Sequence, residues 1–200
     1  MQHSDFNPDY QNLNTQSKIV IALERISQAF RVLLWDQSKE LSLSPIQVQI
    51  LIFLLYHNPE KRKVSYLAKE FNITKASVSD TIKTLEQKQL IAKETHPNDS
   101  RSYTISLTEK GKQLAEQTSV FAQHIREPIN NLEPGIQENL LESLLGVIRH
   151  LNQKGIISVQ RMCQNCHFYS HQNNTHFCKL LNQNLQTPQL RIDCAEHQPL

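Results

Sequence analysis

Four cysteines are gathered in the last forty residues of this 200-residue chain. Two residues separate Cys163 from Cys166, eleven separate Cys166 from Cys178, and fifteen separate Cys178 from Cys194. Two thiolates spaced by two residues can reach one metal from a single turn, and two further cysteines complete the four-thiolate shell of structural zinc and iron–sulfur sites. We therefore expect these four cysteines to bind a metal, with zinc as the first choice and an iron–sulfur cluster as the alternative.

Other interpretations of the cysteines stay open. They could be free buried thiols, or Cys163 and Cys166 could form a redox pair. Cys166-His167 also completes the short haem-attachment pattern, but that chemistry requires export and the polar start of the chain does not resemble a signal. Four histidines are second choices as ligands, because a histidine in a polar loop is more often solvated; they are His167, His171, His176 and His197.

Bulk properties exclude several classes of function. The chain has no His-Glu-x-x-His motif, and no His-x-Glu precedes its Cys-x-x-Cys pair, so we do not expect an enzyme. No apolar run approaches the roughly 18 residues that span a bilayer, so we expect a cytoplasmic protein that does not bind a membrane. The formal net charge of +2 is too small to indicate nucleic-acid binding by itself.

The middle of the chain has the pattern of a winged helix-turn-helix. A short helix is expected from Val64 to about Phe71, a turn at Asn72-Ile73, and a second helix that Thr74 caps. Two β-compatible segments, 90–94 and 103–107, follow on either side of a polar loop and predict a two-stranded wing.

Local charge supports contact between this region and DNA. Residues 61–112 carry eleven lysines and arginines against six aspartates and glutamates. A helix with short polar and basic side chains fits a major groove, and an arginine at the wing tip can enter the minor groove. The candidate contacts to double-stranded DNA are Lys75, Ser77, Ser79, Asp80, Lys83, Asp99 and Arg101.

Long amphipathic helices flank the winged region. The first is expected to close at Trp35, a later one to run from Thr108 to about Ile125 with Pro128 interrupting or ending it, and the last to stop at Gly155. Each helix has an apolar stripe that the small winged domain cannot cover alone, so we expect a homodimer. The stripes are Ile19, Leu23, Ile26, Phe30 and Leu33 in the first helix, and Ile136, Leu140, Leu144, Val147 and Leu151 in the last.

Residues 17–151 resemble the multiple-antibiotic-resistance-regulator (MarR) family of winged-helix transcription factors. The resemblance rests on Asp99-Ser100-Arg101, on the run 106–111 (SLTEKG) and on the run 64–68 (VSYLA). It implies a homodimer of the first and last helices, with recognition helices in successive major grooves and wings in minor grooves of a palindromic operator. Asp80 replaces a residue that is commonly basic, and Gln89 replaces a common glycine, which suggests a different helix cap.

We therefore expect a mainly α fold: a winged-helix DNA-binding and dimerisation domain at 1–157, and a metal-binding module at 158–200. The expected function is a transcriptional regulator, by family analogy a repressor, whose operator binding is controlled by the metal centre or by a small-molecule effector. The alternative is a winged helix that binds protein partners and carries a structural zinc knuckle.

Overall fold

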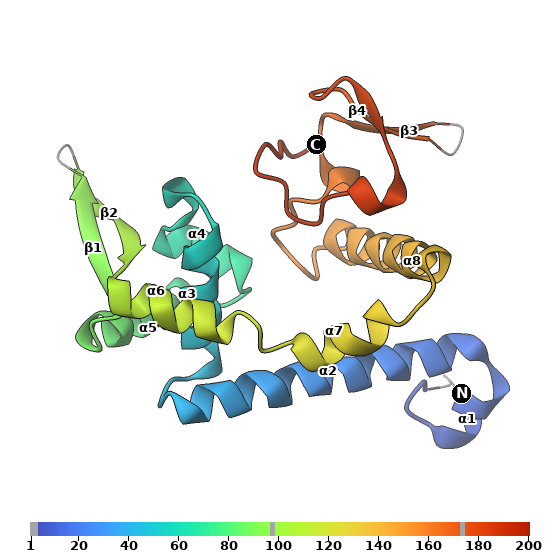
Figure 1. Cartoon of the computed structure of the whole chain (residues 1–200), viewed down its shortest axis with the longest axis horizontal. Helices are drawn as coiled ribbons and strands as arrows, with labels where there is room; N and C mark the ends of the chain where they lie inside the picture. Colours follow the sequence, from blue (N-terminus) through green and yellow to red (C-terminus); the bar gives the residue numbers. More distant parts are fainter. Residues whose placement is uncertain (1–3, 97–98, 173–174) are drawn as a thin grey trace. The chain divides into compact units, whose positions relative to one another are not determined.

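The computed structural model describes residues 4–96, 99–172 and 175–200, with only the backbone described at 95, 96 and 99–102. The chain is mostly helical with two small sheets (Figure 1), so the predicted mainly α class is confirmed. It divides into two compact units, residues 1–63 with 79–125, and residues 64–78 with 126–200. The predicted boundary at 157/158 rests on composition rather than packing and stays a prediction. In the described part, no helix is both long and apolar enough to cross a membrane.

The first unit is built around helix α3, Pro45–Tyr56, which contacts α2, α6 and the wing. Ser44 begins α3 with a capping box. Its hydroxyl accepts a hydrogen bond from the Gln47 N–H, and the Gln47 side-chain oxygen accepts one from the Ser44 N–H. The other elements are α1 (Pro8–Leu13), α2 (Thr15–Glu40), η1 (Pro59–Lys61), β1 (Ile91–His96), β2 (Asp99–Leu107) and α6 (Glu109–Thr118). Fully buried core side chains include Val48, Ile50, Leu51, Leu54, Leu85 and Ile105.

The second unit joins helix α4, Val64–Glu70, to the C-terminal third of the chain. A small core of Leu145, Met162, Leu185 and Leu190 lies under an antiparallel sheet of order β3-β4-β5. Its elements are α8 (Pro134–Gln153), η2 (Cys163–Asn165), β3 (Tyr169–Gln172), β4 (Thr175–Cys178), β5 (Gln183–Leu185) and η3 (Thr187–Gln189). Two helices cross the division between the units: α5, Lys75–Gln87, and α7, Gln123–Asn130.

Helix α8 has two apolar faces, and the predicted stripe is not the one that the single chain buries. Leu145 is buried, and Leu141 and Ile148 pack with it against the C-terminal core. By contrast, the predicted residues Ile136, Leu140 and Val147 are exposed in the single chain. Residues three and four apart share a helix face, so these two stripes lie on different sides of α8. The chain itself uses only one of them.

Three expected helix ends also differ from the structure. Helix α2 continues past Trp35 to Glu40, because nothing in the chain terminates it before the turn at Ser42. Helix α6 stops at Thr118, whose hydroxyl bonds the carbonyls of Leu114 and Ala115. Pro128 lies inside the separate helix α7, which ends two residues later. Side-chain bonding to the backbone near a helix end offers the carbonyls an alternative to further turns.

The expectation of a different cap at Gln89 is wrong, because Gln89 adopts the left-handed conformation that glycine usually takes. Its φ is 58°, its N–H bonds the Glu86 carbonyl, and the Leu90 N–H bonds the Leu85 carbonyl. These two bonds form the Schellman motif, which closes a helix by satisfying its last carbonyls. The same cap ends α2 at Ser42, α4 at Asn72 and α8 at Gly155, as predicted for Gly155.

Replacing Gln89 with glycine should stabilise the protein. A side chain in the left-handed region carries a steric cost that glycine lacks, partly offset by glycine's greater freedom when unfolded. We expect the free energy of unfolding to rise by roughly 0.5–1 kcal/mol. Chemical denaturation followed by circular dichroism measures the change. As a control, Gln87→Gly, which places glycine within α5, should lower stability by roughly the same amount, and a loss at both positions would contradict the capping role.

Candidate nucleic-acid interface and cysteine cluster

A tight turn joins α4 to α5 and sets the start of the second helix. Asn72 has φ 52°, and the Ile73 N–H bonds the Ala68 carbonyl, which closes α4. Thr74 then caps α5, since its hydroxyl accepts from the Ser77 N–H at 3.0 Å. Leu67 and Val78 are fully buried. The predicted helix-turn-helix and its Thr74 cap are therefore confirmed.

Helix α5 presents a polar face to solvent. Val78, Ile82 and Leu85 are fully buried, which fixes the opposite side of the helix as the exposed one. All of the predicted contact residues in this helix are exposed; they are Lys75, Ser77, Ser79, Asp80 and Lys83. The Ser77 hydroxyl lies 2.8 Å from the Thr74 hydroxyl, so Ser77 takes part in the cap.

Two exposed residues of α5 were missed from the sequence. Ala76 and Gln87 occupy the same side of the helix as Asp80 and Lys83, at helical spacings of three and four residues. The spacing from Lys83 to Gln87 is visible in the sequence and could have identified Gln87. An alanine on this face leaves room for close approach, and a glutamine amide can both donate and accept at a base edge.

The wing is an antiparallel pair whose register runs from Ile91 opposite Leu107 to Thr95 opposite Tyr103, with a shift before His96 pairs with Asp99. Asp99 and the predicted minor-groove residue Arg101 both lie in β2, but their side chains fall outside the described residues. Lys93 on β1 bonds the Glu86 carboxylate of α5 and lies over the Tyr103 ring. These contacts attach the wing to the end of α5.

The base of the wing is locked to α6 by Thr108. Its N–H bonds the Leu90 carbonyl, and its hydroxyl bonds the Gln89 carbonyl while accepting from the Gly111 N–H. Gly111 lies close to the Leu90 carbonyl. A Cβ at position 111 would lie 1.8 Å from the Leu90 oxygen. The cap of α5, the start of β1 and the start of α6 are thus joined at one point. The run 106–111 therefore fixes the wing relative to the end of α5.

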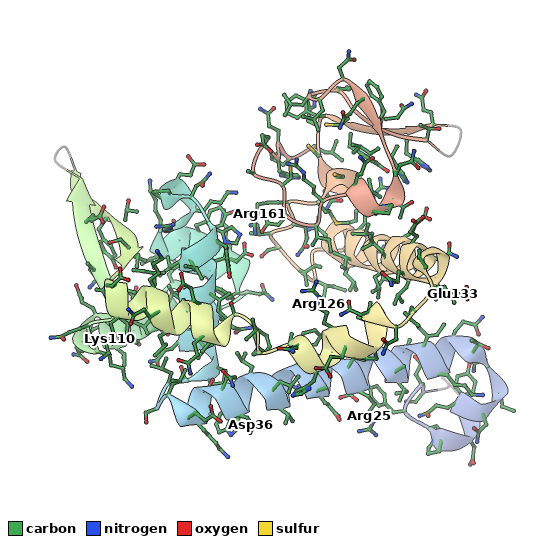
Figure 2. All side chains as sticks on the ribbon, viewed as in Figure 1. Arg25, Asp36, Lys110, Arg126, Glu133 and Arg161 are labelled. Carbon is green, nitrogen blue, oxygen red and sulfur yellow. The ribbon has the colours of Figure 1, made fainter. Side chains whose placement is uncertain are left out.

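Arg161 links the C-terminal segment to α4 (Figure 2). Its guanidinium makes paired bonds to the Glu70 carboxylate, at 2.6 and 3.1 Å, and to the Asp193 carboxylate, at 2.6 and 2.7 Å. It also donates to the Tyr66 hydroxyl at 2.8 Å. Hydrogen bonding to Asp193 raises the pKa of Arg161 above its already high value. Sequence reasoning missed this cluster, whose members are 91 and 32 residues away from Arg161.

Three of the four cysteines line one cavity of about 230 Å³. Cys163 comes from η2, Cys178 from the end of β4, and Cys194 from the segment after η3. The Cys194 N–H bonds the Arg161 carbonyl. Cys166 is buried, and its N–H bonds the Cys163 carbonyl across the Cys-x-x-Cys turn. The fold therefore gathers the predicted ligands into one region.

The thiols do not converge on a single point. Among the described residues, no three His, Cys, Asp or Glu side chains are arranged to hold one metal ion. Burial raises the pKa of the Cys163 thiol, the Arg191 N–H opposes this shift, and the other three cysteines add to it when charged. The Arg191 N–H lies 3.2 Å from Cys163 Sγ, and the Arg191 guanidinium lies 3.6 Å from Cys194 Sγ. Metal binding by Cys163, Cys166, Cys178 and Cys194 stays a prediction.

Known proteins with similar sequences or structures identify the fold of the helix-turn-helix and wing. Residues 41–102, from the start of α3 into the wing, match the model of the MarR family. The structure of S. aureus MepR in complex with DNA superposes with a TM-score of 0.58 at 23% identity, covering 66% of this chain and 97% of MepR. The chain has the MarR winged-helix fold. The predicted resemblance is therefore confirmed for the winged-helix part.

Other relatives agree with this fold. S. aureus MepR in its DNA-binding conformation also gives a TM-score of 0.58 at 23% identity, over 66% of this chain and 98% of MepR. The HTH-type transcriptional regulator BilQ of Clostridioides difficile (strain CD3) is 30% identical over 89 residues, which cover 42% of this chain. The match spans 60% of the length of BilQ.

Proposed function

We propose that this protein is a transcriptional regulator that binds double-stranded DNA through α5 and the wing. The observation that carries the proposal is the capped helix α5, which follows a tight turn and exposes Lys75, Ser79 and Lys83 opposite its buried side. The name of BilQ and the DNA complex of MepR support it. BilQ is named as a transcriptional regulator, and an enzymatic role forms no part of the proposal.

The charges in this region suit a phosphate backbone. Among the described side chains within 61–112, Glu86 is paired with Lys93 and Glu70 with Arg161, so at least these two acidic residues have cationic partners. Lysines on α5 can then contact phosphates, while Ser79 and Gln87 are suited to base edges in the major groove. Asp80, in the middle of the exposed face, can accept from a cytosine amino group. Arg101 on the wing would enter the minor groove, with Asp99 positioning it.

A homodimer is part of the proposal. The exposed stripe of α8 and a second exposed stripe on α2 are larger than scattered surface residues require. On α2, Ile19, Ile26 and Phe30 are exposed and share one side of the helix. Val20, Val32 and Trp35 are exposed on its other sides. A second copy of the chain that covered these helices would give two recognition helices related by a twofold axis, which a palindromic operator needs. A repressor role is the simplest one for a dimer bound over a promoter.

Selection of bound duplexes from a random-sequence pool tests the function. We expect a palindromic consensus, and a Lys83→Ala variant should bind the selected duplex roughly 5- to 10-fold more weakly at physiological salt. Losing one phosphate contact should also reduce the slope of log affinity against log salt by about 1. Lys154→Ala, which removes an exposed lysine at the end of α8, is the matched control and should bind normally. Failure to enrich any sequence would favour the protein-interaction alternative.

The dimer is tested on α8. Val147→Glu places a charge on the exposed stripe and should shift the protein from dimer to monomer in sedimentation equilibrium without unfolding it, because Val147 is 46% exposed in the single chain. Arg149→Glu, at an exposed position on the opposite side of the same helix, should leave the dimer intact. A Val147→Glu protein that stays dimeric would place the interface elsewhere.

A further inference from the structure

The cavity between the cysteines has the features of a cluster site rather than a single-ion site. Zinc holds its four thiolates at about 2.3 Å, so its ligands must converge on one point. A [4Fe–4S] cluster binds each thiolate through a different iron atom, so its ligands surround a volume instead. Cys163, Cys178 and Cys194 line a cavity of about 230 Å³, and Cys166 lies next to it, on the same turn as Cys163. In the described part of the chain, no three of these thiols are placed to hold one ion.

The walls of the cavity suit such a cluster. Leu180, Leu181 and Leu185 line it, so most of its surface is apolar, and the polar side chains of Gln183, Gln189 and Glu196 complete the lining. The Arg191 N–H and guanidinium point at two of the sulfur atoms. Hydrogen bonds to sulfur and an apolar shell are the means by which proteins stabilise iron–sulfur clusters. Arg191, whose guanidinium also pairs with Glu196 at 3.1 Å, offsets part of the negative charge that the thiolates bring.

A short chain of contacts connects Cys194 to the first helix of the helix-turn-helix. Asp193 directly precedes Cys194, and the Cys194 N–H bonds the Arg161 carbonyl. The Arg161 side chain holds Asp193 on one side and Glu70 and Tyr66 of α4 on the other. Ser158 also bonds the Lys69 carbonyl on α4. A change in the position of residues 193–194 therefore reaches α4 through one side chain.

We propose that Cys163, Cys166, Cys178 and Cys194 hold a [4Fe–4S] cluster, and that the bound cluster orders α4 for DNA binding through Asp193 and Arg161. The cluster is supplied as two ferrous ions, two ferric ions and four sulfides, which together make a [4Fe–4S] core of charge +2. Binding replaces four S–H bonds with four S–Fe bonds, releases four protons to solvent and transfers no electron. The second half of the proposal rests on the proposed function, whereas the first half stands without it.

The cluster is tested on the full chain, purified without oxygen and also reconstituted with equal amounts of ferrous and ferric iron and with sulfide. We expect about four iron and four sulfide per chain and a broad visible absorption. Cys163→Ser should lose the iron, whereas His167→Ala, which removes an exposed histidine beside Cys166, should keep it. A colourless protein that holds one zinc ion, or no metal, would overturn the cluster. Circular dichroism checks that each variant is folded.

The link to α4 is tested by DNA affinity, with duplexes selected by the wild-type protein. Loaded protein should bind about tenfold more tightly than protein stripped of iron. Asp193→Asn should keep its iron but lose most of this difference, because it weakens the contact to Arg161. Equal affinity of both wild-type forms would overturn the link. If neither form binds any duplex while the iron is present, the proposed function fails and the cluster stands.

Discussion

Replacing Gly111 with alanine should destabilise the protein by about 3 kcal/mol or more. The new Cβ would lie 1.8 Å from the Leu90 carbonyl oxygen and 2.8 Å from its carbon, and both are backbone atoms that no rotamer change can move. The same oxygen accepts from the Thr108 N–H, so relieving the clash would break the joint between the wing and α6. Chemical denaturation followed by circular dichroism gives the free energy of unfolding.

Gly146 provides a matched control for this substitution. It also lies inside a helix, but a Cβ there meets nothing within 4 Å. Alanine is a better helix former than glycine by about 1 kcal/mol, so Gly146→Ala should stabilise the protein. Opposite signs at the two glycines would tie the effect at Gly111 to the close contact. Similar stability of both variants would show that the backbone at Leu90 can move without cost.

The contrast shows what the sequence can and cannot predict. The run 106–111 identified the wing and its exit through a family resemblance, but the reason for glycine at 111 is a contact with Leu90, across the wing. Local signals gave Thr74 as a cap and Gly155 as a stop, because capping depends on neighbours in the chain. The cap at Gln89 differs from the one predicted because residue type alone does not set φ.

Periodicity failed differently in α8. Its sequence has two apolar stripes, and periodicity alone does not say which stripe the chain buries and which it leaves for a partner. Leu145 and Val147 are similar in character, yet one is buried and the other is 46% exposed. The small β3-β4-β5 sheet escaped prediction because its strands are only three or four residues long and rich in polar residues. The Arg161 cluster left no local signal.

Replacing Arg161 with methionine should cost about 3–5 kcal/mol of stability in the second unit. The Arg161 side chain is only 10% exposed and the Glu70 side chain only 17%, so methionine would leave a nearly buried carboxylate without its cation. Asp193 is 42% exposed and would be partly rehydrated, so most of the loss should come from Glu70. The stability of the Arg161→Lys variant should fall between those of the wild-type and Arg161→Met proteins. Lysine keeps the positive charge but cannot make two bonds to each of the two carboxylates.

A double-mutant cycle separates the loss of packing from the unpaired charge. In the Glu70→Gln background no buried negative charge remains at position 70, so Arg161→Met should cost about 1–2 kcal/mol less than in the wild-type background. The difference measures the coupling between the two side chains. If the cost is the same in both backgrounds, the guanidinium acts mainly through its aliphatic contacts, and the electrostatic link from α4 to the cysteine segment is weak. A large coupling would establish that the residues beside Cys194 and the first helix of the helix-turn-helix are energetically one group.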